Sequence, residues 1–270
     1  PTTAVDFRES APAALTRARF DTMIAGGGGG PASVGVPGSV AGLLLAHERF
    51  GRLPRRRVLE PAIRLARQGH RVSARTALTL SWSYPELARD AGARAEFGRN
   101  GEALAAGARW VRRDLAGTLE RIADEGAPGF YAGPVAAAIA ARLDGHLSAA
   151  DLGGYAARLR EPLRFGYRGL TVETMPPPSA GGVALAVLLL ELARQRAHEL
   201  EPGSVLDLHL FLEASRRAQV ERRLRVVDPD RLEPEILARR VAEWTDPERP
   251  LPGAVPIDRT RATPSAALHP

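Results

Sequence analysis

Apolar residues recur at helical spacing in three segments of the chain. The first segment ends before Gly69, a residue type that favours a helix C-terminus. The second begins at Asp114, which we expect to be its N-cap, and ends at Gly126. The third begins at Pro134. The positions that carry these patterns are Val58, Leu59, Ala62, Ile63 and Ala66; Leu115, Leu119 and Ile122; and Val135, Ile139 and Leu143.

Two serine and aspartate pairs have the spacing of a capping box, in which each side chain accepts from the backbone of the other. They are Ser148 with Asp151 and Ser204 with Asp207. Each pair predicts a helix start. The second helix is expected to be long and to reach toward Val226.

Two more segments read as helix. Residues 183–190 are wholly apolar, which predicts a buried core helix, because the run is far shorter than the roughly 20 residues of a membrane span. Residues 235–244 form the second segment. They lie in a proline-rich stretch that begins after Asp228 and is otherwise expected to be an extended tail.

Strand signal is sparse. Leu170, Val172 and Thr174 alternate with polar residues, which predicts one strand before prolines 176–178 stop the pairing. Residues 21–35 contain five consecutive glycines and are expected to form a mobile loop without a regular element. The chain is therefore predicted to be mostly helical, and it contains no internal repeat.

The net charge and the distribution of charged residues do not alter the prediction of a mostly helical chain. The 270 residues carry a net charge of +6, and all 37 basic residues are arginine. Asp and Glu total 31 and are interspersed with the arginines, which indicates solvated helix faces, so we expect no nucleic-acid partner. The first residues contain neither a basic nor an apolar stretch of a signal peptide. No membrane span is expected.

Complete catalytic motifs are not evident from the residues themselves. The chain has no cysteine, and its six histidines show no metal-binding spacing, so no metal site is predicted. Ser39 in Gly38-Ser39-Val40-Ala41-Gly42 is misplaced for a nucleophile elbow. The glycine run lacks the lysine of a phosphate-binding loop.

A series of motifs nevertheless resembles the γ-glutamyltranspeptidases, also called glutathione hydrolases. The resemblance covers about residues 4 to 230, and the motifs follow the family's order. They are Asp6-Phe7-Arg8-Glu9-Ser10-Ala11-Pro12, Val36-Pro37-Gly38-Ser39-Val40-Ala41-Gly42, Pro61-Ala62-Ile63-Arg64-Leu65-Ala66 with Gly69, Asp114-Leu115-Ala116-Gly117-Thr118-Leu119 with Phe130-Tyr131-Ala132-Gly133, Asp151-Leu152 with Tyr155, Tyr167-Arg168-Gly169, and Met175-Pro176-Pro177-Pro178-Ser179-Ala180-Gly181-Gly182.

The resemblance implies an α+β fold, part of the αββα sandwich of the N-terminal nucleophile hydrolases, with this portion mostly helical. It implies a precursor that cleaves itself, and a small subunit whose N-terminal threonine attacks γ-glutamyl compounds such as glutathione. It implies no cofactor. Residues 1–230 are then the large-subunit core, lacking the family's N-terminal part, and residues 231–270 a proline-rich tail before the small subunit.

Arg8 is the one substrate-binding residue that the resemblance assigns. In the family this arginine binds the α-carboxylate of the γ-glutamyl group, for which a guanidinium offers a two-pronged match. Asp6 and Glu9 are expected to orient Arg8 or to hold its loop. No catalytic residue is predicted in this chain, and neither Thr260 nor Thr263 begins a matching nucleophile motif.

The turn after the prolines is expected to pack closely at a helix start. Gly181 and Gly182 allow the close approach, and Ser179 is the expected cap. The family usually has a second serine where Ala180 stands. A hydroxyl role at that position is therefore not predicted.

Two alternatives remain open at this stage. One is a related acylase or amidohydrolase of the same fold, acting on glutaryl-cephalosporins or poly-γ-glutamate. The other is a non-catalytic remnant of a truncated gene. Under the leading hypothesis of a processed heterodimeric enzyme, this chain alone is likewise predicted to be inactive, because it lacks the threonine nucleophile. Family resemblance favours a periplasmic or secreted location, while the sequence itself leaves localisation, oligomeric state and the balance of hydrolysis and transfer undetermined.

Overall fold

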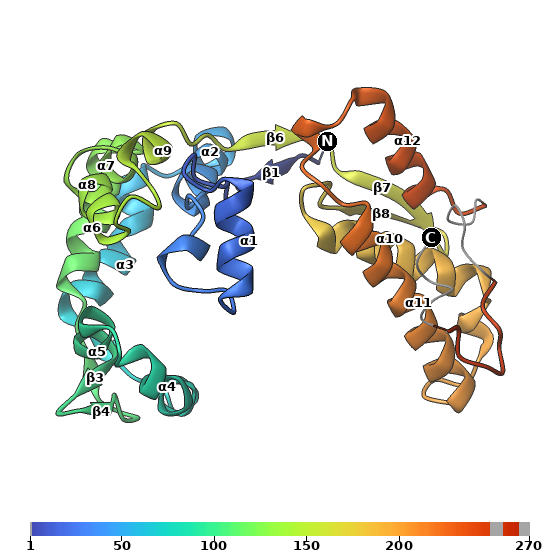
Figure 1. The fold of residues 1–270 in the computed structure, drawn as a ribbon, viewed down its shortest axis with the longest axis horizontal. Coiled ribbons are helices and arrows are strands. Elements are labelled where there is room, and N and C mark those ends of the chain that lie inside the picture. Colours follow the sequence, from blue (N-terminus) through green and yellow to red (C-terminus); the bar gives the residue numbers. More distant parts are fainter. Residues whose placement is uncertain (1, 249–255, 265–270) are drawn as a thin grey trace. The chain divides into compact units, whose positions relative to one another are not determined.

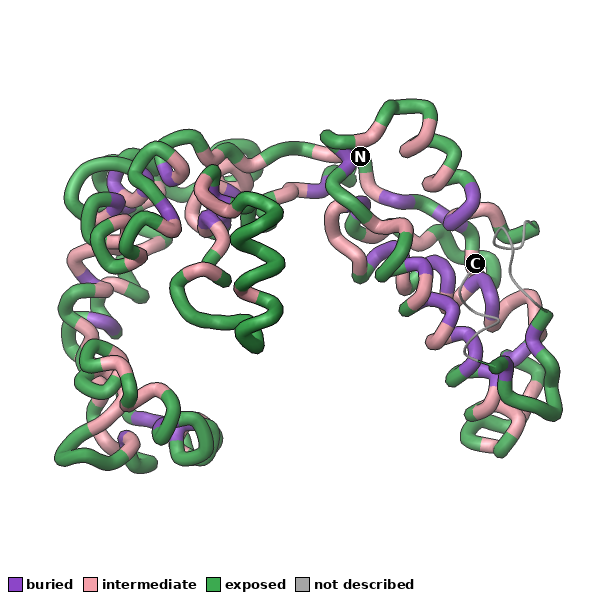
Figure 2. Tube along the Cα trace, in the orientation of Figure 1, coloured by how far each residue is buried: buried purple, intermediate pink, exposed green. Residues whose placement is uncertain are grey.

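The computed structural model of the protein describes residues 2–248 and 256–264. The chain forms two compact units (Figure 1). The terminal unit combines Pro1–Arg8 with Ala157–Pro270, and the central unit is Glu9–Ala156. Each unit has its own buried residues, shown in Figure 2. Segments from both ends of the chain thus belong to one unit.

The terminal unit contains two antiparallel strand pairs and three longer helices. β1 pairs with β6, and β7 pairs with β8. In chain order the elements are β1 (Ala4–Asp6), β6 (Arg158–Arg160), β7 (Leu163–Tyr167), β8 (Leu170–Thr174), α10 (Ala180–Arg194), a 3-10 turn (Ala197–Glu199), α11 (Val205–Leu224), a second 3-10 turn (Pro229–Arg231) and α12 (Pro234–Thr245).

β7 and β8 form a hairpin. The predicted strand is confirmed as β8. Its partner β7, which buries Leu163 and Phe165, was not predicted although the two strands have the same length. Arg168 and Gly169 form the two-residue turn with φ of 51° and 78°. Positive φ at both positions is the backbone of a type I′ turn, which matches the twist of paired strands.

The predicted core helix is confirmed as part of α10. Val183 and Leu190 are buried, and Figure 2 shows further buried positions along α10 and α11. Ser179 holds the N-cap position as expected, but its side chain makes no capping hydrogen bond. Among the helices that the structure describes, none has the length and apolarity needed to cross a membrane.

The long helix α11 is confirmed and ends at Leu224, two residues before the expected end. Only half of its capping box forms. The Ser204 hydroxyl accepts from the Asp207 amide at 3.2 Å, but the Asp207 carboxylate accepts from the Gly203 amide at 2.8 Å instead of from that of Ser204. The Asp207 carboxylate therefore pairs with the amide of Gly203, the residue before the N-cap Ser204.

Two described segments beyond residue 230, α12 and the residues around Ile257, pack in the terminal unit. Helix α12 is confirmed over Pro234–Thr245, and Trp244 on it is 1% exposed in a core cluster with β7, α10 and α11. The Trp244 indole N–H donates to Glu221 Oε2 at 2.7 Å. Ile257 is buried against Ala197 and Leu210. Residues after 230 thus share a core with the strands and helices before them, which the proline content does not indicate.

In the described residues the central unit is largely helical, with four strands of two residues each that form two pairs. β2 pairs with β5, and β3 with β4. In chain order its elements are α1 (Arg17–Ala25), a 3-10 turn (Pro31–Ser33), α2 (Ser39–Phe50), α3 (Arg55–Gln68), β2 (His70–Arg71), α4 (Ala74–Leu87), α5 (Ala91–Phe97), β3 (Gly98–Arg99), β4 (Glu102–Ala103), β5 (Arg109–Trp110), α6 (Arg113–Glu125), α7 (Pro128–Tyr131), α8 (Gly133–Arg142) and α9 (Ala149–Gly153).

The three helices predicted from apolar spacing are confirmed as α3, α6 and α8. Gly69 and Gly126 follow α3 and α6 at positive φ, as expected of helix ends. The predicted N-cap of α6 was wrong, because Arg112 takes that position two residues after β5 and Asp114 lies in the first helical turn. A carboxylate there still interacts favourably with the helix dipole. The capping box of Ser148 and Asp151 is confirmed at α9.

The expectation of no regular element in residues 21–35 was wrong, because α1 covers the first of these residues and a 3-10 turn forms at Pro31–Ser33. Helix α1 extends to Ala25, capped by the Thr16 side chain and supported by an ion pair between Arg17 and Asp21 at 2.9 Å. These local contacts form the helix although none of its residues is buried. The glycines do end it, since residues 27–30 all have positive φ, a backbone that side chains disfavour.

Candidate functional site

Arg8 lies two residues after the end of strand β1, and the backbone amide of Arg8 is held by Asp6. Asp6 Oδ1 accepts a hydrogen bond from the Arg8 N–H at 3.1 Å. The Asp6 side chain is only 11% exposed, whereas Arg8 is exposed. The loop after β1 therefore begins at a fixed position and presents a permanently charged guanidinium beyond it.

The other oxygen of Asp6 belongs to a chain of ion pairs that is buried at Asp6 and Arg160 and exposed at Asp230 and Arg158. Arg160 on β6 donates from Nε to Asp6 Oδ2 at 2.6 Å. Its two terminal nitrogens donate to both oxygens of Asp230, at 3.1 Å and 2.7 Å. Such two-pronged pairs combine charge with fixed geometry. A second arginine, Arg158, contacts Asp230 Oδ2 at 2.7 Å, so two arginines balance two carboxylates.

These contacts shift the acidity of the groups involved. The hydrogen bond from Arg160 is the largest cause that lowers the pKa of Asp230, and it outweighs the opposing effect of burial. The pKa of Arg160 is raised, first by the hydrogen bond to Asp230 and then by that to Asp6. Both groups are thus held in their charged forms.

The motif residues after Arg8 belong to the central unit, where several of the other motifs meet. The Asp151 carboxylate accepts from the Ala13 amide at 2.8 Å, and Ser10 forms an antiparallel bridge with Val36. The Tyr131 hydroxyl donates to the Pro37 carbonyl at 2.7 Å. Four buried or half-buried residues from three motifs share one core cluster, namely Val36, Tyr131, Leu152 and Tyr155.

Asp6 and Glu9, both expected to support Arg8, lie in different units. Asp6 accepts a hydrogen bond from the Arg8 backbone amide, and its expected role of orienting Arg8 or holding the loop stays a prediction. Glu9 packs in the central unit, where a Cβ added at Gly35 would come within 3.0 Å of its side chain. The orienting role of Glu9 and the substrate contact of Arg8 stay predictions.

The turn before α10 packs as closely as the sequence predicts. A Cβ placed on Gly182 would lie 1.9 Å from the Met175 carbonyl oxygen, while one on Gly181 would meet only Ser179 Oγ at 4.0 Å. Gly182 is therefore required by the close approach of the backbone, and Gly181 is not.

The threonines near the end of the described chain have local bonding partners. The Thr260 hydroxyl donates to Asp258 at 2.8 Å. Thr263 is buried, and its amide donates to Glu213 Oε2 at 3.3 Å. Within residues 2–248 and 256–264, no three His, Cys, Asp or Glu side chains are grouped so that they could hold a metal ion.

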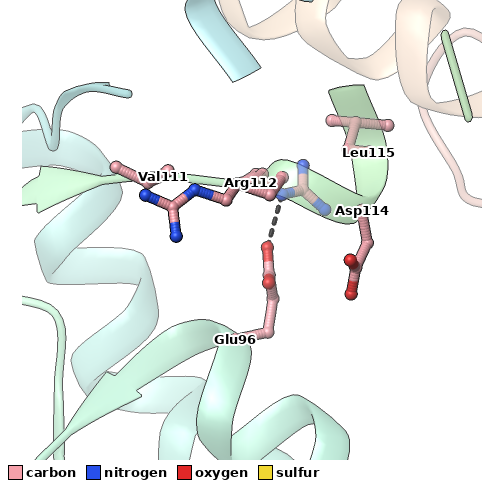
Figure 3. Close-up of a pocket in the computed structure, with 6 residues that line it drawn as sticks. Glu96, Val111, Arg112, Asp114 and Leu115 are labelled. Atoms are coloured by element: carbon pink, nitrogen blue, oxygen red, sulfur yellow. Dashed lines mark hydrogen bonds and ion pairs between the residues drawn. The ribbon is translucent and has the colours of Figure 1, made fainter. Parts of the chain in front are cut away.

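A hollow of about 390 Å³ lies at the start of α6 in the central unit (Figure 3). Arg112 projects over it, forms an ion pair with Glu96 from α5 and stacks on Trp110 with 5.0 Å to the ring centroid. Asp114 adds a second carboxylate to the lining. The arginine charge is thus already matched within the hollow, which holds no nucleophile and base in contact.

Two residues of the Arg8 region were not found from the sequence. Arg160 and Asp230 contact Asp6 or each other across 154 and 70 positions of the chain. No local pattern links residues so far apart, and Arg160 is one of 37 arginines. The pairing of β1 with β6 brings Asp6 and Arg160 together, and Asp230 reaches Arg160 from the 3-10 turn Pro229–Arg231.

Sequence comparisons agree on one family. The profile described as Gamma-glutamyltranspeptidase matches residues 1–266. The glutathione hydrolase proenzyme of Escherichia coli (strain K12) is 36% identical over 243 residues, covering 85% of this chain and 41% of that protein. The glutathione hydrolase proenzyme of Pseudomonas aeruginosa is 34% identical over 281 residues, covering 98% and 48%. The chain therefore spans less than half the length of these relatives.

An acylase is also similar. The acylase ACY 1 proenzyme of Pseudomonas sp. (strain V22) is 37% identical over 203 residues, covering 74% of this chain and 36% of that protein. The similarity thus includes a protein that is named an acylase.

Structural comparison gives the same grouping. The structure resembles the crystal structure of Helicobacter pylori γ-glutamyltranspeptidase with a TM-score of 0.81 and 29% identity, covering 98% of this chain and 78% of that one. It resembles the γ-glutamyltranspeptidase from Pseudomonas nitroreducens with a TM-score of 0.77 and 33% identity, covering 91% and 74%. The mostly helical α+β fold expected for a part of an N-terminal nucleophile hydrolase is confirmed. With the sequence profile matching nearly every residue and the fold in agreement, this chain belongs to the γ-glutamyltranspeptidase family.

Proposed function

We propose that this chain is the large-subunit portion of a glutathione hydrolase and γ-glutamyltransferase, in which Arg8 binds the α-carboxylate of the γ-glutamyl donor. The observation that carries the proposal is the motif Asp6-Phe7-Arg8-Glu9, with the Arg8 amide fixed by the Asp6 carboxylate at 3.1 Å. A guanidinium can form two parallel hydrogen bonds with a carboxylate, which a lysine cannot.

The chemical step belongs to a partner in this proposal. The partner is a small subunit that begins with threonine. Its threonine hydroxyl attacks the γ-glutamyl carbonyl, the threonine α-amino group takes the proton and passes it to the leaving amine, and a covalent acyl-enzyme forms. Water or an acceptor amine then takes the acyl group. This chain supplies binding of the donor and no catalytic residue.

Arg8→Ala in the full-length protein tests the proposal with a chromogenic γ-glutamyl anilide as donor. We expect KM to rise by a factor of about 30 or more, because breaking a buried charge-assisted pair costs roughly 2 to 5 kcal/mol. Arg8→Lys should restore part of the binding, since lysine keeps the positive charge but cannot form the two parallel hydrogen bonds of a guanidinium. Self-cleavage into two polypeptides, followed by gel electrophoresis, should be unchanged. An unaltered KM for Arg8→Ala would remove Arg8 from the donor site.

An acylase activity is the second candidate, favoured by the 37% identity to the acylase ACY 1 proenzyme. A glutaryl anilide keeps the carboxylate that Arg8 would bind but lacks the α-amino group of a γ-glutamyl anilide. Comparison of kcat/KM for the two anilides separates the candidates. Preference for the γ-glutamyl compound supports a hydrolase or transferase, preference for the glutaryl compound supports an acylase, and turnover of neither supports a non-catalytic protein.

A further inference from the structure

We propose that Arg160, held by Asp230, is a positioning residue for Arg8 and thereby sets the affinity for the carboxylate of the donor. The inference rests on the proposed function, because Arg8 is the group that would be positioned. It adds two residues from the far part of the chain to the donor site. Neither is in the motif that contains Arg8.

The first step of the argument is the division of the Asp6 carboxylate between two donors. Oδ1 accepts from the Arg8 amide at 3.1 Å, and Oδ2 accepts from Arg160 Nε at 2.6 Å. The last torsion of an aspartate side chain is broad, so one hydrogen bond alone leaves the carboxylate free to rotate. The Arg160 bond fixes the plane of the carboxylate, and the oxygen that faces the Arg8 amide is fixed with it.

The second step is the fixed position of Arg160 itself. Strand pairing places Ala4 opposite Arg160 and Asp6 opposite Arg158, so Asp6 and Arg160 are diagonal neighbours across the β1 and β6 pair. Diagonal neighbours lie within reach of long side chains. Beyond Asp6, both terminal nitrogens of Arg160 are bonded to Asp230, so the guanidinium cannot turn about its long axis.

Burial makes this chain of contacts stronger than a surface ion pair. The Arg160 side chain is 16% exposed and that of Asp6 is 11% exposed. Exposed pairs are screened by water and contribute little, whereas partly buried charged hydrogen bonds hold their geometry. A displacement of Arg160 would therefore move the Asp6 carboxylate and, with it, the Arg8 backbone amide.

The test is Arg160→Gln in the full-length protein, measured with the γ-glutamyl anilide. We expect KM to rise about tenfold while kcat changes less than about twofold, since the affected interaction is donor binding. Asp230→Asn keeps the shape of its side chain and should give a smaller rise in KM. Arg164→Gln is the matched control, because it removes an arginine of the same unit that pairs with Glu173 at 2.6 Å on the hairpin, and we expect no change in KM.

A purely structural clamp would give a different result. Arg160→Gln would then lower the melting temperature and leave KM unchanged, which would overturn the inference. In the double variant with Arg8→Ala, we expect KM close to that of Arg8→Ala alone, because a positioning residue has nothing left to position; additive effects would contradict it. If Arg160→Gln fails to fold, Asp230→Asn and Arg160→Lys decide the question by the same KM measurement.

The failure of the proposed function and the failure of this inference are distinguishable. If Arg8→Ala itself leaves KM unchanged, the proposed function fails. If Arg8→Ala raises KM but the Arg160 and Asp230 variants leave KM unchanged, this inference fails and the proposed function stands.

Discussion

Among single residues, Tyr131 links two motifs of the central unit. Its hydroxyl donates to the Pro37 carbonyl at 2.7 Å and accepts from the Ala41 amide at 3.1 Å, near the start of α2. The residue is 6% exposed, and burial raises the pKa of its hydroxyl against the opposing effect of the Ala41 hydrogen bond. The motif that contains Tyr131 therefore holds the loop before α2 in place.

Tyr131→Phe should lower the free energy of unfolding by about 1 to 3 kcal/mol, because a buried amide and carbonyl lose their partner. Urea unfolding followed by circular dichroism measures the change. Tyr167→Phe at the end of β7 is the control, since that half-buried residue lies in the terminal unit, and a change below about 0.5 kcal/mol is expected. Equal losses in both variants would mean that the Tyr131 hydroxyl contributes nothing specific.

At this scale the sequence revealed only part of the candidate site. Arg8 could be predicted because its motif is local, with Asp6 two positions away. Arg160 could not, because its contact with Asp6 spans 154 positions and depends on strands of three residues that carry no clear alternation. Asp230 lies in a proline-rich segment whose composition predicts no contact with the core.

Among the elements, the join between the proline turn and α10 depends on Gly182. The Cβ of an alanine there would lie 1.9 Å from the Met175 carbonyl oxygen, and neither backbone can move without shifting the helix or β8. Gly182→Ala should therefore cost about 1 to 3 kcal/mol of unfolding free energy, as overpacking of a close contact does.

Gly181→Ala is the matched control one residue earlier in the same helical turn. Its Cβ would be 4.0 Å from the nearest side-chain atom, and alanine favours helix over glycine by up to about 1 kcal/mol. We expect this variant to be neutral or slightly stabilised in chemical denaturation. A loss of the same size for both variants would show that the turn is sensitive to any residue other than glycine.

Elements with a long apolar stripe were predictable, and elements without one were not. The helices α3, α6 and α10 have such stripes or runs, and their positions are confirmed to within a few residues. Helix α1 has no buried residue and forms through its cap and an ion pair, so apolar spacing gave no sign of it. Strands of two residues, such as β2, are too short for any period.

Over the whole molecule, the division into two units was not visible in the sequence. The chain leaves the terminal unit after Arg8 and returns to it at Ala157, and no change in composition marks either point. Strand β1 lies just before the point where the chain leaves the terminal unit, and β6 lies just after the point where it returns. These two strands pair with each other inside the terminal unit. Long-range pairing of this kind depends on the folded chain and leaves no local signal.

Each unit contains a hydrogen-bonded aspartate whose pKa is lowered, and this predicts how the two units respond to acid. The pKa of Asp151 in the central unit is lowered, first by the hydrogen bond from the Ala13 amide and then by that from Ser148. The pKa of Asp230 in the terminal unit is lowered, first by Arg160. A carboxyl whose pKa is lower in the folded state stabilises the fold above its unfolded pKa of about 4, and the stabilisation is lost as pH falls through the folded pKa.

Both units should therefore lose stability below about pH 4, and each loss should be separable by substitution. Asp151→Asn should reduce stability at pH 7 and flatten the acid dependence of the central unit alone, and Asp230→Asn should do the same for the terminal unit alone. Hydrogen exchange with mass spectrometry between pH 7 and pH 3, corrected for the intrinsic exchange rate, assigns protection to each unit. If either variant changed the acid response of both units equally, the units would unfold as one cooperative body, and the pKa of each aspartate would report on the stability of the entire chain.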